Sequence, residues 1–144
     1  MSLSLLLSLQ VVSLGPPLPV QGRVIARAEP GVPLPLSRIR RVLRRCPGKD
    51  STWKRPLEIR LVSAATLSQF KPSRADHARR GRYLIGSPKS PAIIYLAQGA
   101  DLDLSLLHEW LHHQDAIEGK HRSEAVIEAE AKRCAMARPP DKSP

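Results

Sequence analysis

The sequence predicts a small α+β domain, because short strand-like segments and longer helix-like segments are interleaved along it. Three short segments have the alternating or continuously apolar pattern of β-strands, at 56–64, 82–86 and 92–97. Three longer segments repeat apolar residues at helical spacing, at 37–46, 103–117 and 123–137. With 144 residues, the chain has room for one modest core. We therefore expect one domain in which helices cover a small three-stranded sheet.

Residues 1–34 are expected to precede this domain. Residues 1–15 are uncharged and leucine-rich like the apolar part of a signal peptide, but they lack a basic start and are too short for a stable membrane span. Prolines recur too often in residues 15–35 for a helix or a central strand, which predicts a linker. The domain is assigned to 35–138 and a disordered tail to 139–144. The protein is then cytoplasmic, or secreted or periplasmic if the apolar segment is a signal peptide.

The first helix is predicted to be amphipathic and to begin after Ser37 as its N-cap. Arginines occupy its outer faces, and its apolar stripe consists of Ile39, Val42, Leu43 and Cys46. The turn-forming pair Pro47-Gly48 ends it.

The sheet is expected to be antiparallel or mixed. Its first strand is predicted to be half-buried, because apolar residues alternate there with polar ones: Leu57, Ile59 and Leu61 against Glu58 and Arg60. ATLSQF after it indicates a short helical turn, and the charged residues 71–82 indicate a loop. RYLIG and AIIYLA are the other two strands, separated by the turn-forming GSPKSP.

Two helices complete the domain. The first is expected to start with Asp103 or Ser105 as its cap and to stop at Gly119, since glycine accepts the left-handed conformation that ends many helices. The second is expected to be capped by Ser123 and to end near Ala137, ahead of two prolines.

The first of these helices contains the motif His-Glu-x-x-His. Residues four apart lie on one face of a helix, so His108 and His112 can direct imidazole nitrogens at one ion. A catalytic Zn²⁺ takes three protein ligands and a water. Glu109 can reach that water without binding the metal and can act as the general base. The motif thus predicts zinc-dependent hydrolysis of peptide bonds, with an exposed helix carrying two incidental histidines as the alternative.

The third zinc ligand is expected to come from the last helix. If the two helices pack antiparallel, residues equally far from the loop face each other. His112 is five residues before Ile117 and Glu128 is five residues after Ser123, so Glu128 is the expected ligand. Glu124 lies about one turn, or roughly 6 Å, nearer the loop and is the alternative. Two other donors fit this geometry less well, Glu118 and His121.

The sequences HEWLHH and EAVIEAEAKRCA together resemble the gluzincin class of zinc metallopeptidases, in which a second helix supplies a glutamate ligand. EAEAKRCA is similar to the E-x-x-A-N-x-F-A stretch of short ImmA/IrrE-type bacterial metallopeptidases. The resemblance covers residues 92–137 and implies a zincin-like domain with Glu128 as a zinc ligand. It also implies that AIIYLA is the edge strand to which an extended substrate adds. Three residues are candidate donors to the oxyanion of the reaction, Tyr83, Tyr95 and His113.

The formal net charge of +10 raises nucleic acid as a partner. The basic residues form two runs, at 38–45 and 71–82, without interleaved aromatic residues on which bases could stack. Solvated basic faces are the simpler interpretation, and nucleic acid is not the expected partner.

Cys46 and Cys134 are too few for a zinc ribbon. They form a disulfide if the chain is exported, or remain small buried residues in a reducing compartment.

The sequence therefore predicts a zinc metallopeptidase that acts on a peptide or protein substrate. The alternatives are a catalytically silent, zinc-stabilised regulatory or binding domain and, with less support, a basic nucleic-acid-binding protein.

Overall fold

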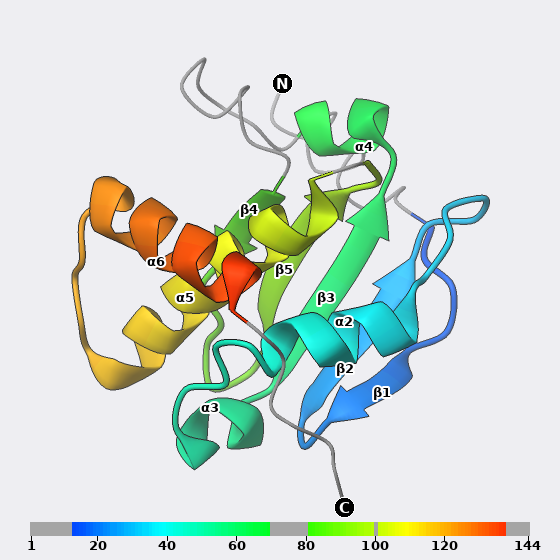
Figure 1. Cartoon of the computed structure of the whole chain (residues 1–144). Coiled ribbons are helices and arrows are strands. Elements are labelled where there is room, and N and C mark those ends of the chain that lie inside the picture. Colours follow the sequence, from blue (N-terminus) through cyan, green and yellow to red (C-terminus); the bar gives the residue numbers. More distant parts are fainter. Residues whose placement is uncertain (1–12, 70–80, 100, 138–144) are drawn as a thin grey trace, which may run out of the picture.

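The computed structural model describes residues 13–69, 81–99 and 101–137. These residues form a mixed five-stranded sheet covered by helices (Figure 1), so the fold is α+β as expected. The strands are β1 (Leu18–Gln21), β2 (Val24–Ala28), β3 (Leu57–Val62), β4 (Gly81–Leu84) and β5 (Ala92–Ala97). Their order across the sheet is β1-β2-β3-β5-β4, in which β2, β3 and β5 run parallel and the two outer strands run antiparallel to their neighbours.

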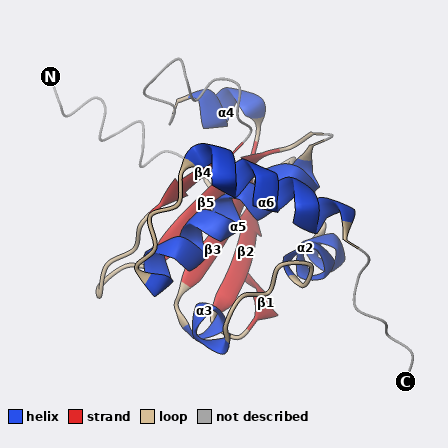
Figure 2. Cartoon of the chain, turned by 60° about the vertical axis from the view of Figure 1, so that its left-hand side comes forward, coloured by secondary structure: helices blue, strands red, loops and turns tan. Residues whose placement is uncertain are grey.

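Five helices are described: α2 (Leu36–Leu43), α3 (Asp50–Lys54), α4 (Ala64–Ser68), α5 (Leu102–Glu118) and α6 (Glu124–Met136). Figure 2 shows α5 lying over the sheet and α6 crossing in front of α5 as an outer layer. The main core lies between the sheet, α2 and α5, and a smaller apolar cluster on the opposite face includes Leu67 of α4.

The prediction of a linker at 15–35 is wrong, because this stretch contains the β1–β2 hairpin and leads directly into α2 at Leu36. Its prolines are tolerated because Pro19 lies in an outer strand, where a missing backbone donor breaks no central ladder. Gly22 makes the turn at a φ of 55°, and a side chain there would collide with the Trp53 carbonyl. Val24 and Ala26 are fully buried. The fold therefore includes residues that the sequence assigned to a leader.

The expected three-stranded sheet gains β1 and β2, and this addition changes the role of β3. β3 lies between two parallel neighbours rather than at a surface, so the prediction of a half-buried strand is wrong. Its polar Glu58 is also buried, with its carboxylate 2.8 Å from Nε of Arg60 and 3.5 Å from Nη1 of Arg27.

The edge strand beside the motif helix is β4 and not β5. AIIYLA forms β5 at the predicted residues, but it is hydrogen-bonded to β3 on one side and to β4 on the other. The outer position belongs to β4, which runs alongside α5.

Two predicted helix boundaries are confirmed, the end of α5 at Gly119 and the start of α6 at Ser123. Gly119 adopts a φ of 69° at the end of α5, and Ser123 caps α6 by accepting from the amide of Val126. Two starts are wrong: α2 begins at Leu36 before Ser37, and α5 begins at Leu102 before Asp103. The carboxylate of Asp103 accepts from Nε of Arg38 at 2.6 Å, which ties α5 to α2.

Cys46 fixes α5 and α6 to the rest of the core. Its carbonyl oxygen accepts hydrogen bonds from Nε1 of Trp110 and Nε2 of Gln114, both at 2.7 Å. The Trp110 ring packs against that of Trp53 with centroids 4.8 Å apart. The sulfur of Cys46 forms a disulfide with Cys134 of α6, which decides between the two alternatives for the cysteines.

The predicted signal segment up to residue 12, most of the predicted 71–82 loop and the tail at 139–144 lie outside the described residues. In the described part of the chain, no helix has both the length and the apolar character that crossing a membrane requires.

We predict that losing the disulfide lowers the free energy of unfolding by about 2–4 kcal/mol, since the bridge closes a long loop and so restricts the unfolded chain. The measurement is chemical denaturation of oxidised protein, reduced protein and the double variant Cys46→Ser/Cys134→Ser. The reduced protein and the variant should agree, and equal stability of oxidised and reduced protein would contradict the prediction.

Candidate metal centre

The two histidines of the motif lie on one face of α5, as predicted. Their Nε2 atoms are 3.2 Å apart, and their ring centroids are 4.9 Å apart. The side chain of His108 is only 8% exposed and that of His112 is 25% exposed. An exposed helix with incidental histidines does not describe this arrangement, because polar rings are costly to bury unless they are bonded.

Two carboxylates of α6 face these histidines. Glu124 lies with Oε2 3.1 Å from Nε2 of His108 and with Oε1 2.7 Å from Nε2 of His112. Glu128 contacts the opposite side of the first ring, with Oε1 2.8 Å from Nδ1 of His108. α5 and α6 therefore pair so that His112 lies opposite Glu124 and His108 lies opposite Glu128.

This pairing differs by one helical turn from the predicted one, in which His112 faced Glu128. The three donors that converge within 4.8 Å are His108, His112 and Glu124, the alternative of the sequence analysis. Glu128 faces the motif as expected. Because it bonds Nδ1 of His108, it lies on the other side of that ring from the convergence point.

The cause of the shift is a polar clamp across the α5–α6 loop. Nε and Nη2 of Arg122 donate to Oδ1 of Asp115 at 2.8 and 2.6 Å, and the Arg122 amide donates to Oδ2 at 3.3 Å. The amide of Lys120 also donates to the Asp115 carbonyl oxygen at 2.9 Å. These bonds fold the loop back over the last turn of α5, so α6 begins alongside that turn and not beyond the end of α5. Counting equal distances from the loop does not register such a clamp, and sequence reasoning assigned no role to Asp115 or Arg122.

The converging donors fit a zinc ion. When His108 binds a metal ion through the lone pair of Nε2, its Nδ1 carries the proton and donates it to the carboxylate of Glu128, which only accepts hydrogen bonds. Tetrahedral Zn²⁺ with bonds near 2.0–2.1 Å places its ligand atoms about 3.3 Å apart. The distances of 3.2, 3.1 and 2.7 Å lie near that value. The Glu124 side chain is 47% exposed, which leaves a solvent side open for a fourth ligand.

A second group of possible donors comprises Cys46, Glu130 and Cys134. Because the two sulfurs form the disulfide, they are not thiolates that could bind a metal in this state.

Glu109 lies outside the converging group, as a general base should. It is buried at 4% exposure and packs against Gly81 of β4. A Cβ at Gly81 would approach Cγ of Glu109 to 3.0 Å and Oε2 to 3.3 Å, so a side chain there would crowd the carboxylate. The side chain therefore lies between the motif helix and the edge strand.

The three candidate donors to the oxyanion lie on two different faces of the sheet. Tyr95 belongs to the apolar cluster on the opposite face of the sheet from α5, and its hydroxyl accepts from Arg60 at 2.7 Å. Tyr83 and His113 lie on the α5 side and bond to each other, with the hydroxyl 2.9 Å from Nδ1. Burial raises the pKa of Tyr83 to about 12, and burial together with the nearby Arg55 charge lowers the pKa of His113 to about 4. Both side chains are thus neutral near pH 7.

The other candidate ligands are not in the converging group. His121 is an exposed loop residue, and Glu118 lies 3.1 Å from Nζ of Lys120 and 3.9 Å from Nζ of Lys49.

The first arginine run stabilises the fold. Nη2 of Arg40 donates to the Pro19 carbonyl at 2.6 Å, and Nη1 of Arg45 donates to the Ala135 carbonyl at 3.0 Å. With the Arg38–Asp103 ion pair, these bonds use three of its arginines to join α2 to β1, α5 and α6. This use of the charges weakens the case for a nucleic-acid interface.

Comparisons of the chain with protein-family models, with curated proteins and with solved structures found no match.

We predict that Asp115→Asn weakens zinc binding about tenfold and lowers the free energy of unfolding by about 1–3 kcal/mol, because Arg122 loses its charged acceptor and the loop relaxes. Lys120→Gln is the matched control, since it removes a loop charge that makes only a surface ion pair. Zinc titration and denaturation of both variants measure the effects. A loss of zinc affinity in the control equal to that in Asp115→Asn would contradict the role of the clamp.

Proposed function

We propose that this protein is a zinc-dependent metallopeptidase that hydrolyses peptide bonds. The observation that carries the proposal is the convergence of the two motif histidines with Glu124, beside a buried Glu109. Convergence of this kind between side chains of two neighbouring helices is unexpected for incidental histidines. The resemblance of the motif to gluzincins agrees with it.

In this proposal, His108, His112 and Glu124 hold the ion. Glu128 is a positioning residue that fixes the tautomer and ring orientation of His108 through Nδ1. The bound zinc would supply a water of lowered pKa and would polarise the scissile carbonyl.

Glu109 is the proposed general base. It follows His108 directly in the chain, and its carboxylate lies beside Gly81 of the edge strand. Its role is to accept the proton of the attacking water and to pass it to the leaving nitrogen. The low exposure of its side chain strengthens its electrostatic interactions with reacting groups.

The proposed substrate-binding edge is β4. It is the last strand of the described sheet on the side of α5, and it runs antiparallel to β5. An extended peptide can add to such an edge through main-chain hydrogen bonds, which would bring a scissile carbonyl past Gly81 and Glu109. The resemblance implied β5 as the substrate-binding edge, but both sides of β5 are paired with other strands.

The main alternative is a zinc-stabilised domain without turnover. The core and the disulfide already connect α5 and α6 without any metal ion, which favours a site used for chemistry over one needed for folding. Chelation should therefore leave the fold intact.

We expect Glu124→Gln to weaken zinc binding at least 100-fold, because it removes a charged ligand. Glu128→Gln should weaken it about tenfold, because it changes only the partner of a ligand. Competition titration with a zinc-binding dye measures both dissociation constants, and circular dichroism checks the fold of each variant. The reverse order would assign Glu128 as the ligand, as the sequence alone suggested.

We expect Glu109→Gln to retain zinc and to lose peptide hydrolysis by about 10²–10⁴-fold, since proton transfer is lost while the ligands remain. Cleavage of a broad peptide library read by mass spectrometry, with metal analysis of the same samples, is the measurement. Glu118→Gln is the control, because this glutamate lies on α5 outside the converging group. Zinc-free protein in every sample, or equal cleavage by the Glu109 variant and the wild type, would overturn the proposal.

A further inference from the structure

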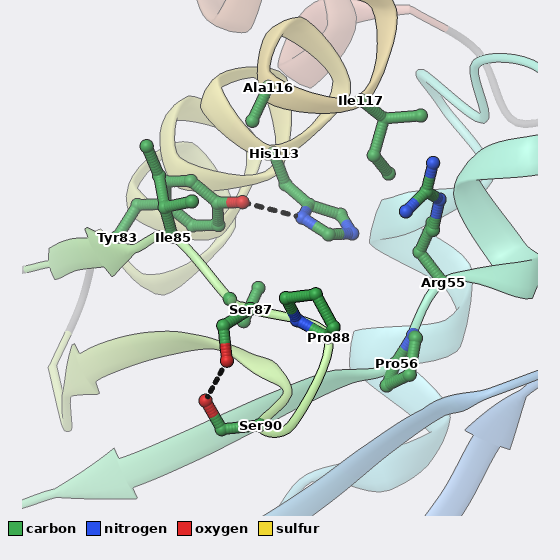
Figure 3. A pocket seen from close by; sticks show the side chains of 12 residues that line it. Arg55, Pro56, Tyr83, Ile85, Ser87, Pro88, Ser90, His113, Ala116 and Ile117 are labelled. Atoms are coloured by element: carbon green, nitrogen blue, oxygen red, sulfur yellow. Dashed lines mark hydrogen bonds between the residues drawn. The ribbon is translucent and has the colours of Figure 1, made fainter.

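A cavity of about 310 Å³ lies between α5, the end of β4 and the segment that joins α3 to β3. Figure 3 shows the side chains around it, with Tyr83 and Ile85 on one side, His113, Ala116 and Ile117 from α5 above, and Arg55 on the other side. We call it the Arg55 pocket. None of the functional assignments made above uses it.

Apolar side chains form about half of the wall of the Arg55 pocket. Ile85, Ala116 and Ile117 line it together with Pro56, Pro88 and Ala92. Ile85 is 78% exposed, which is unusual for so large an apolar side chain. A surface of this kind suits an aliphatic stem more than a strongly hydrated group.

Arg55 is the only charged residue among those that line the pocket. Within residues 13–69, 81–99 and 101–137, no hydrogen bond or ion pair of its guanidinium is found. An unpaired guanidinium beside apolar walls is suited to a carboxylate, which it can bind through two parallel hydrogen bonds.

The inner wall offers a second polar group without a partner. His113 is 2% exposed, its Nδ1 is bonded to Tyr83, and its Nε2 has no hydrogen-bond partner in the described part of the chain. When the Tyr83 hydroxyl donates to Nδ1, Nε2 carries the proton and adds a donor next to Arg55. An anionic group near this wall would therefore meet two donors and no competing acid.

The pocket lies along the proposed path of the substrate. His113 is one turn beyond Glu109 on α5, or about 6 Å at 1.5 Å per residue. Tyr83 is likewise two residues beyond Gly81 on β4, a similar distance along a strand. A substrate strand that crosses Glu109 would therefore place a side chain in the pocket about two residues from the bond that is cut.

The direction of the substrate decides which side of that bond is recognised. β4 runs from Gly81 at Glu109 toward Tyr83 at the pocket. A peptide that adds antiparallel to β4, the more stable pairing, has its amino-terminal part at the pocket. The residue in the pocket then precedes the scissile bond.

We propose that the Arg55 pocket binds an acidic side chain of the substrate, about two residues before the bond that is cut. The methylene groups of a glutamate would pack against Ile85, Ala116 and Ile117, and its carboxylate would bind Arg55. This assignment rests on the proposed peptidase function and specifies its substrate class: peptides with an acidic residue on the amino side of the cleaved bond. The net charge of +10 agrees with it, since a basic protein attracts acidic chains.

The binding test uses zinc-loaded Glu109→Gln protein, so that peptides are held and not cut. The probes are two peptides with blocked termini that differ only in a single glutamate or glutamine, and calorimetry measures their dissociation constants. The glutamate peptide should bind about tenfold more tightly. Adding Arg55→Gln should remove this preference. Adding Arg55→Glu should create the opposite preference, so that a peptide with lysine at this position binds more tightly than the glutamine peptide.

The matched control is Arg23→Gln, added to the same protein. Arg23 lines the neighbouring hollow beyond Pro88, so the change removes the same charge without touching the Arg55 pocket. The control should keep the glutamate preference within about twofold. An equal loss of the glutamate preference in the Arg23 and Arg55 variants would mean that the preference comes from nonspecific electrostatic attraction, and it would overturn the proposal.

Two further measurements separate the remaining outcomes. A peptide whose only carboxylate is its free C-terminus should bind no better than the glutamine peptide, and tighter binding would overturn the side-chain assignment. In wild-type digests, cleavage sites should be enriched in glutamate or aspartate about two residues before the cut. Cleavage without that enrichment rejects the pocket and keeps the peptidase, whereas glutamate-selective binding without any cleavage rejects the peptidase and keeps the pocket.

Discussion

The arrangement of the candidate metal centre depends on one residue, Cys46, which holds both helices that form it. Its carbonyl oxygen accepts hydrogen bonds from Trp110 and Gln114 and so fixes the rotation of α5 about its own axis. Its sulfur is bonded to Cys134 and so holds the far end of α6. Because Trp110 is fixed toward the core, the histidines on either side of it in sequence must face α6. The chemistry of the site thus depends on a backbone carbonyl that belongs to neither helix.

The second constraint acts at the other end of the helix pair, where the bonds between Asp115 and Arg122 fix the path of the loop. A helix pair held at both ends can neither slide nor separate easily, so the carboxylates of α6 meet the imidazoles in one register. Glu124 then reaches both Nε2 atoms while Glu128 holds Nδ1 of His108. In the proposed centre, Glu124 would share a metal ion with the two histidines, and Glu128 would keep a lone pair of His108 directed at that ion.

The polar groups on the two faces of the sheet have different roles. On the face away from α5, the Glu58 carboxylate pairs with both Arg27 and Arg60, and Arg60 also bonds Tyr95. On the α5 side, Arg55 has no such partner among the described residues, and the neutral pair of Tyr83 and His113 lies beside it. Part of the positive charge of the described residues is therefore used in internal contacts, whereas Arg55 remains available near the edge strand. The proposed binding of an acidic side chain depends on this available charge.

The sequence by itself determined the features that depend on local chemistry. Helical spacing placed His108 and His112 on one face, Gly119 and Ser123 marked helix ends through their own backbone and side-chain preferences, and AIIYLA was recognisable as a strand. Tertiary structure alone decided what depends on contacts between distant segments. The number of prolines indicated a linker at residues 15–35, whereas these residues form a hairpin whose outer strand tolerates proline. β5 is an internal strand because β4 pairs with its other side. The positions of Glu124 and Glu128 also depend on such contacts. The two glutamates lie one turn apart on one helix face, so helical periodicity does not distinguish them. Only the clamp across the loop places Glu124 at the convergence of the imidazole nitrogens.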